Sequence, residues 1–271
     1  DDGSDPGRPA PHTEVGASCL AFFAVGSGFA SDTEALRARS GIEAVLDGRL
    51  PGFSVDYACP LAQETRWFTM AVMPLDQYTG HGAVITHSEI TALKRAEQYE
   101  QYRSRTLERL AADEPLEVIL DALVRDVERL NPAMLCSILL CDSEGTHLLS
   151  GAAPSLPDFF TAAVNGLKIG AGIGSCGTAA YTGQRVVVED VTTHPYWERS
   201  KSLAARAGLG SCWSEPIRAS TGQVLGTFAI YHRQAHTPAE SDIVIIEQAA
   251  HLASIAIEKN LAAERLRESE A

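Results

Sequence analysis

A cysteine inside a cluster of glycines is the residue of this sequence best placed to do chemistry. Cys176 lies in a stretch with glycines at positions 170, 172, 174 and 177. Glycine adopts backbone angles closed to other residues, so this spacing indicates a tight loop whose main chain is exposed or closely approached. A short helical run follows, and unpaired N–H groups at a helix start stabilise a thiolate. The stretch predicts either a reactive thiol or a small buried side chain.

Two carboxylates follow the glycine cluster at the end of an apolar run. The β-branched residues Val186–Val188 predict a buried strand, and Glu189 and Asp190 come directly after it. A loop with a thiol, a short helix and a strand that ends in acid together indicate the wall of a small-molecule pocket. The candidate ligand-binding residues of this stretch are Gly174, Ser175, Cys176, Glu189 and Asp190.

The same glycines fit a G-x-G-x-x-G pattern between Gly172 and Gly177. A dinucleotide fingerprint also needs a buried strand before the pattern and a full helix after it. Only Leu167–Ile169 precede the glycines, and Gly183 interrupts the helix that follows. We therefore interpret the pattern as a structural turn.

Cofactor and metal sites are not predicted. The cysteines form no C-x-x-C pair, and the histidines lack the spacing of metal or haem ligands. The cysteines are dispersed and no export signal is evident, which predicts reduced thiols in a cytoplasmic protein. The six cysteines stand at positions 19, 59, 136, 141, 176 and 212.

Charge and hydropathy exclude two kinds of partner for this segment. The net charge is -13 and no local Lys/Arg cluster offsets it, so nucleic acid is not an expected partner. The longest apolar runs, such as Met134–Cys141, are too short to cross a bilayer. The 271 residues have room for two ordinary domains, and the absence of an initial Met leads us to expect a piece of a longer chain.

The first half of the chain predicts a helix and a small sheet after a disordered leader at residues 1–14. Helical spacing covers Asp32–Leu46. Three alternating segments then predict an antiparallel meander of Phe53–Cys59, Arg66–Pro74 and Gly82–His87. From Ser88 the pattern becomes that of a long amphipathic helix, which we expect to be a connector that pairs with a copy of itself.

This arrangement resembles the C-terminal half of a PAS domain. Ser88–Glu97 is similar to the segment that ends the last strand of that family and enters a charged helix, with Glu89 in place of its usual Asp. The Trp67-Phe68 pair and Pro74-Leu75 resemble the preceding strand. The resemblance implies a partial PAS-like domain at residues 15–92 and a connector helix at 93–114.

The second half predicts alternating helices and strands. A helix begins after Pro115, and the capping box Thr237–Glu240 predicts the start of a final helix with a coiled-coil-like seam. Between these helices we expect strands at Met134–Cys141, His147–Ala152, Val186–Val188, Ser211–Ile217 and Val224–His232. We also expect a short helix that ends at Asn165 and a helix at Pro195–Ala207.

The order of these elements, with Gly174–Ala180, Val188–Val191, Cys212–Ile217 and Leu225–Phe228, resembles a GAF domain. The resemblance covers residues 115–260 and leaves 261–271 as a helical extension. It points to the GAF modules of bacterial sensor kinases and cyclic-di-GMP enzymes, where PAS and GAF domains stand in tandem before an output domain. The resemblance implies signal transduction by a homodimer that pairs through its terminal helices.

The GAF part also resembles free methionine-(R)-sulfoxide reductase, whose nucleophile stands at the place of Cys176. Glu189-Asp190 match that enzyme's Glu-Asp, but Cys212 replaces a carboxylate of its substrate site. In a GAF fold, Cys176 and Cys212 border the same cavity, so the resemblance implies either a reversible disulfide or two buried inert thiols. Trp213 is a candidate wall of that cavity, or plain core.

The sequence therefore predicts an α+β chain: a PAS-like antiparallel sheet fragment and a GAF domain, joined and extended by long helices. We expect a sensor that binds a small molecule or senses redox state in the GAF domain and relays it to an output domain in cis. This segment itself is expected to lack catalytic activity, with a methionine sulfoxide reductase-like enzyme as the alternative, in which Cys176 is catalytic.

Overall fold

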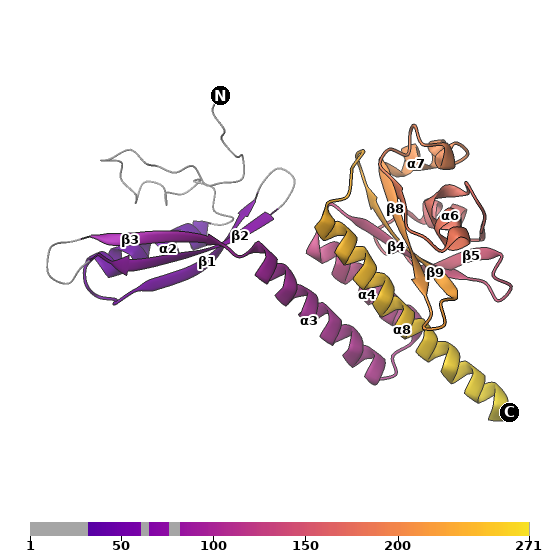
Figure 1. The fold of residues 1–271 in the computed structure, drawn as a ribbon, viewed down its shortest axis with the longest axis horizontal. Helices are drawn as coiled ribbons and strands as arrows, with labels where there is room; N and C mark the ends of the chain where they lie inside the picture. The colour runs from indigo at the N-terminus through magenta and orange to yellow at the C-terminus, as the bar shows by residue number, and fades with distance from the viewer. Residues whose placement is uncertain (1–31, 61–64, 76–81, 271) are drawn as a thin grey trace. The chain divides into compact units, whose positions relative to one another are not determined.

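The computed structural model describes residues 32–60, 65–75 and 82–270 (Figure 1). The predicted leader at 1–14 and the apolar segment at 15–30 lie outside the described residues. The chain divides into two compact units, Asp1–Gln98 and Tyr99–Ala271, and the boundary falls within helix α3, Thr91–Ala111. The structure has the predicted α+β class, with antiparallel sheets and flanking helices.

The first unit is a three-stranded antiparallel meander with one helix against it. Its elements are α2 (Asp32–Leu46), β1 (Phe53–Pro60), β2 (Thr65–Pro74) and β3 (Ala83–Glu89), in the sheet order β1-β2-β3. Alternation along β2 buries Phe68, Met70 and Val72, which pack with Ile42 of α2. The predicted helix, strands and meander are confirmed.

Helix α3 begins at Thr91, three residues after the start of the helical pattern predicted from Ser88. We expected helical structure from Ser88, but β3 continues to Glu89, which pairs with Phe68 of β2. Thr91 then fixes the junction, because its Oγ1 accepts a hydrogen bond from the Trp67 backbone N–H at 3.0 Å. The helical structure expected from Ser88 was therefore wrong at its start, because strand pairing continues through Glu89.

The second unit is a six-stranded antiparallel sheet in the order β6-β5-β4-β9-β8-β7. Met134–Cys141, predicted as a central strand, pairs as β4 with β5 on one side and β9 on the other. The elements are α4 (Leu116–Leu130), β4 (Leu135–Cys141), β5 (His147–Ala152), α5 (Asp158–Val164), β6 (Leu167–Lys168), α6 (Gly174–Thr182), β7 (Val186–Val188), the 3-10 helix η1 (Pro195–Trp197), α7 (Lys201–Ala207), β8 (Ser211–Arg218), β9 (Val224–His232) and α8 (Glu240–Glu270).

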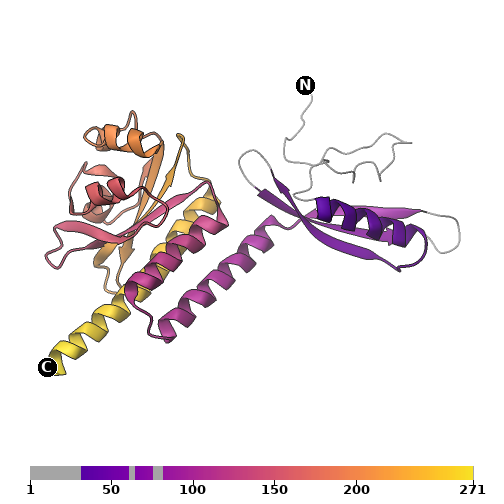
Figure 2. The same ribbon diagram turned by 180° about the vertical axis from the view of Figure 1, so that it is seen from behind.

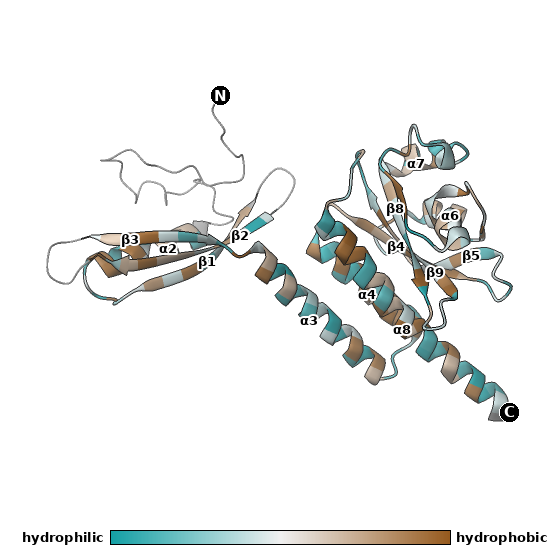
Figure 3. Ribbon diagram, viewed as in Figure 1, coloured by the Kyte–Doolittle hydropathy of each residue, from teal (hydrophilic) through white to brown (hydrophobic). Residues whose placement is uncertain are grey.

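Helices cover both faces of this sheet (Figure 2). On one face α4 and α8 pack against an apolar core that includes Phe228 and Ile230 of β9. On the other face α5, α6 and α7 cover a second core around Ala229 and Tyr231. Successive residues of β9 therefore contribute to the two cores in turn. Figure 3 shows hydrophobic residues along the strands and a largely hydrophilic C-terminal end of α8.

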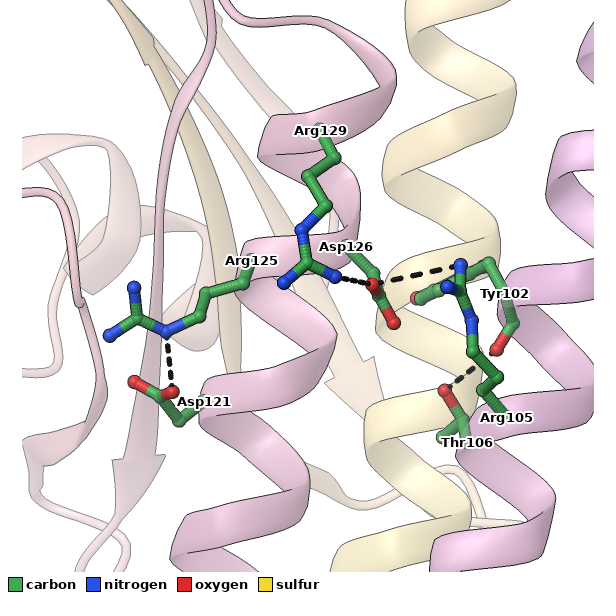
Figure 4. A network of polar contacts seen from close by, with 7 residues as sticks. All are labelled: Tyr102, Arg105, Thr106, Asp121, Arg125, Asp126 and Arg129. Carbon is green, nitrogen blue, oxygen red and sulfur yellow. Dashed lines mark hydrogen bonds and ion pairs between the residues drawn. The ribbon is translucent and has the colours of Figure 1, made fainter.

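The C-terminal part of α3 packs with α4 through a polar network (Figure 4). The Asp126 carboxylate, almost fully buried, pairs with Arg129 at 2.7 Å and with Arg105 of α3 at 3.7 Å. Tyr102 is also buried there, and Thr106 Oγ1 donates to its carbonyl oxygen at 3.1 Å. These contacts hold the C-terminal part of α3 against α4 within the second unit.

Two predicted helices differ from the structure. The helix expected at Pro195–Ala207 is divided into η1 and α7, because the buried Trp197 ends the first piece and its carbonyl oxygen accepts from Ser200. The capping box at Thr237 is also wrong. Helix α8 begins at Glu240, and the Asp242 carboxylate accepts from the Ala239 backbone N–H at 2.9 Å.

Candidate functional site

The glycine cluster shapes the start of helix α6 and places Cys176 in its first turn. Gly172 and Gly174 have φ angles of +75° and +57°, which favour glycine. Gly177 lies against β6, because a Cβ on it would come within 2.7 Å of the Lys168 carbonyl oxygen. The tight turn and the close backbone approach that the glycines predicted are both present. The helix already starts at Gly174, so Cys176 belongs to the helix and not to the preceding loop.

Cys176 and Cys212 come together between α6 and β8. Both side chains are buried, with exposed fractions of 5% and 0%, and both thiols are free. The two residues belong to the same buried core cluster, and each side chain influences the pKa of the other. A central helix and a central strand thus bring together two thiols that are 36 residues apart.

Three hydroxyl groups complete the surroundings of the Cys176 sulfur. Ser214, Thr227 and Tyr231 lie on the same face of β8 and β9 as Cys212, and their hydroxyl groups influence the pKa of Cys176. The Ser214 and Thr227 hydroxyls are buried and have no hydrogen-bond partner among the described residues. The Tyr231 hydroxyl also bonds to Ser137 Oγ at 3.2 Å.

These neighbours favour the thiolate form of Cys176. The neighbouring Cys212 side chain is the largest cause that lowers the pKa of Cys176 to about 7, and the three hydroxyls lower it further against the opposing effect of burial. Burial and the neighbouring Cys176 raise the pKa of Cys212 well above its ordinary value. One sulfur is therefore suited to act as nucleophile and the other to remain protonated.

Ser175 positions the start of α6 against the sheet. Its hydroxyl accepts a hydrogen bond from Trp197 Nε1 at 2.9 Å and donates to the Cys212 carbonyl oxygen at 3.4 Å. All three side chains are buried. Ser175 thus links η1, α6 and β8 around the two thiols.

The remaining candidate residues lie away from the thiols. The Asp190 carboxylate accepts from the Thr192 N–H at 2.8 Å and from its hydroxyl at 2.6 Å, which lowers the pKa of Asp190. The Glu189 side chain is exposed. Trp213 belongs to the core on the other face of the sheet, where its ring contacts those of His232 and His236.

Sequence reasoning missed the hydroxyl residues, although one signal was available. Successive strand residues face opposite sides, so Ser214 shares the face of Cys212 and Trp213 cannot. Thr227 and Tyr231 could be found only from the register between β8 and β9, in which Cys212 lies opposite Tyr231.

No metal site is evident in the part of the chain that the structure describes. No three His, Cys, Asp or Glu side chains gather there in a way that could hold a metal ion. Among the described helices, none combines the length and apolar character needed to cross a bilayer.

A six-stranded antiparallel sheet with helices on both faces, and a glycine-bordered helix packed on one of them, defines a GAF domain. The GAF domain family model matches residues 113–258, and this chain belongs to that family. The fold is similar to the GAF domain of a phosphoenolpyruvate-protein phosphotransferase from Coxiella burnetii, with a TM-score of 0.52, 23% identity and coverage of 64% of this chain and 98% of that one. The corresponding Acinetobacter domain gives a TM-score of 0.50 at 17% identity and covers 64% of this chain and 98% of that chain.

Among curated proteins, the chain is similar to the methyl sulfide methyltransferase-associated sensor of Methanosarcina acetivorans. The two are 41% identical over 182 residues, which cover 67% of this chain. The match spans 18% of the sensor's own length. The second unit is thus a GAF domain homologous to part of a sensor protein.

Proposed function

We propose that this chain is a sensory module in which Cys176 and Cys212 respond to an oxidant. One observation carries the proposal: two free, buried thiols lie in one core cluster, and the pKa of only one of them is lowered. The Ser214 and Thr227 hydroxyls are buried without a hydrogen-bond partner among the described residues, and both would favour a thiolate on Cys176. The similarity to a sensor protein supports a regulatory role.

The chemistry is a two-electron oxidation by a peroxide. The Cys176 thiolate attacks one peroxide oxygen, so that an S–O bond forms, the O–O bond breaks and the leaving oxygen takes up a proton. The Cys212 sulfur then attacks the Cys176 sulfur, so that the S–S bond forms and the S–O bond breaks. Water leaves with the Cys212 proton. The thiol pair has lost two electrons to the peroxide, and a small thiol reductant reverses the step.

Arg185 provides a path from the thiols to the terminal helix. It lies between α6 and β7, and its Nε donates to Glu215 on β8 at 2.5 Å. Its Nη2 also pairs with Glu247 on α8. A movement of α6 on disulfide formation would therefore be transmitted to α8 through one guanidinium group.

The opposite end of α8 is tied to the connector. Lys259 pairs with Asp113 at 2.5 Å and bonds to the Leu110 carbonyl oxygen at the end of α3. We propose that α3 and the C-terminal part of α8 pair with their copies in a homodimer. In this proposal residues 15–92 form a partial PAS-like domain, and an output domain in cis, such as a kinase or a cyclic-di-GMP enzyme, receives the signal in the cytoplasm.

Oxidation followed by intact-mass measurement tests this function. With equimolar hydrogen peroxide, the reduced protein should lose two hydrogens, and peptide mapping should join Cys176 to Cys212. Cys212→Ser should instead trap an added oxygen on Cys176, and Cys136→Ser, a matched change at another buried cysteine, should leave the disulfide intact. An unchanged mass, or oxidation spread evenly over the cysteines, would contradict the proposal.

The same protein tests the enzymatic alternative. The nucleophile position of Cys176 favours a reductase, but neither Glu189 nor Asp190 turns toward the sulfur. We expect no turnover of free methionine sulfoxide with a thiol reductant. Multiple turnovers that disappear in Cys176→Ser would replace the sensor function with the enzymatic one.

A further inference from the structure

A cavity of about 330 Å³ lies between β4, β5 and α5, apart from the candidate residues of the glycine stretch. Its apolar walls come from Leu139 and Leu156, and its polar groups from Ser137, Ser150, Thr161 and Asn165. The volume is within the range of small-molecule sites, and an apolar lining with a few polar groups is typical of them. The cavity is therefore large enough for a one-ring molecule.

The lining determines the chemical class of the ligand. No residue that lines the cavity carries a charge. A charged molecule would lose its hydration there without an ionic partner, whereas a neutral molecule would not incur that cost. Hydroxyl and amide side chains offer donors and acceptors to a carbonyl, hydroxyl or amide of the ligand.

One wall of the cavity is connected to the thiols. Ser137 lines the cavity and its Oγ bonds to the Tyr231 hydroxyl at 3.2 Å. Tyr231 and Cys176 belong to the same buried cluster, and the Tyr231 hydroxyl also lowers the pKa of Cys176. Ser137 has an exposed fraction of 3%, so its hydroxyl cannot turn freely to water. A ligand that bonds to Ser137 would change the hydrogen bonding of the Tyr231 hydroxyl and, through it, the effect of this hydroxyl on Cys176.

We propose that this cavity binds a small, uncharged, partly apolar molecule, and that its occupancy reaches Cys176 through Ser137 and Tyr231. Binding itself is independent of the proposed redox function. The effect on the thiol rests on that function, so the two parts have separate readouts.

Three probes of equal shape and different charge test binding. Benzamide, benzoate and benzamidinium are added to the isotope-labelled protein, and the amide signals of Ser150, Gly151 and Asn165 are followed. Benzamide should give saturable shifts with a dissociation constant of roughly 1 mM, and the charged probes should bind at least about tenfold more weakly. No saturable shift with benzamide, or equal shifts with all three, would overturn the site.

Two matched variants test whether benzamide binds in this cavity. Ser150→Phe should fill the cavity and weaken benzamide binding at least about tenfold. Leu149→Phe, next to it on the opposite face of β5, should leave binding unchanged. Equal effects of the two variants would place the probe elsewhere and overturn the proposal.

The connection to the thiol is tested by the ultraviolet absorbance of the Cys176 thiolate. Saturating benzamide should change the ratio of thiolate to thiol at neutral pH by at least about twofold. In Tyr231→Phe, benzamide should still bind but the change should disappear. Binding without any change in the native protein would overturn the connection and keep the site.

Discussion

Cys212 on β8 and Cys176 in the first turn of α6 belong to one buried cluster, and the Cys212 side chain lowers the pKa of the Cys176 thiol. The two cysteines are chemically unequal, because Cys212 favours the thiolate of its neighbour and burial keeps Cys212 itself protonated. The difference distinguishes a nucleophile from its resolving partner within one buried pair.

Titration of Cys176 tests this inequality. Thiolate absorbance, taken as the difference between the native protein and Cys176→Ser, should rise with a midpoint near the pKa of about 7. Cys212→Ala removes the main cause of the lowered pKa, so the midpoint should move upward. A midpoint at or above 9.0, the ordinary thiol value, would contradict the account.

The same pKa shift predicts a pH dependence of stability. Folding lowers the pKa of Cys176, so the folded protein gains stability above the pKa of the unfolded thiol and loses it as the pH falls through about 7. The native protein should therefore gain free energy of unfolding relative to Cys176→Ser between pH 7 and pH 9. Parallel stability curves for the two proteins would exclude the shift.

Ser175 should be important for stability, because it supplies the acceptor for a buried indole N–H. Ser175→Ala leaves Trp197 Nε1 without this partner and should lower the free energy of unfolding by about 1–3 kcal/mol, measured by urea denaturation. Trp197→Phe removes the donor, so adding Ser175→Ala to that variant should cost less. Equal costs in both backgrounds would show that the hydrogen bond contributes nothing.

Arg185 should stabilise the protein mainly through Glu215. Burial raises the pKa of Glu215, and Arg185 is the main group that lowers it. Arg185→Gln should raise that pKa further and cost about 2 kcal/mol at pH 7, because a largely buried carboxylate loses its partner. The loss should shrink as the pH falls and the carboxylate is protonated. Glu247→Gln changes the exposed partner of Arg185 and should lower the free energy of unfolding by less than about 1 kcal/mol. A larger loss for Glu247→Gln than for Arg185→Gln would show that Glu215 is not the main partner.

The proposed homodimer predicts a role for exposed leucines on the terminal helices. Leu107 on α3 and Leu266 on α8 have exposed fractions of 39% and 59%. Replacing both with Glu should weaken the dimer at least about tenfold, measured by sedimentation. Leu149→Gln on β5, also exposed, should leave the dimer intact, and a monomeric native protein would contradict the proposal.

Much of the fold could be predicted because apolar spacing determines which face of an element is buried. The alternation around Phe68 and Met70 predicted β2, and the apolar run of β4 predicted a central strand. Helix boundaries at Ser88 and Thr237 failed because strand pairing and the Asp242 cap decided them, and neither contact is evident from local sequence.

The candidate site was predictable only in part. The glycines identified the turn at Cys176, and the family resemblance placed Cys212 beside it. Ser137 and Thr227 belong to the surroundings of the site through the pairing of β4, β9 and β8, which no single segment contains. Glu189 and Asp190 follow a strand as predicted, but local hydrogen bonding holds Asp190 in a turn.

Hydrogen exchange of the reduced and the fully oxidised protein tests the central claim most directly. The account predicts that formation of the Cys176–Cys212 disulfide changes amide exchange in residues 183–188 and also in residues 243–250 of α8, and that Arg185→Gln removes the second change. Complete disulfide formation with unchanged exchange throughout α8 would contradict it.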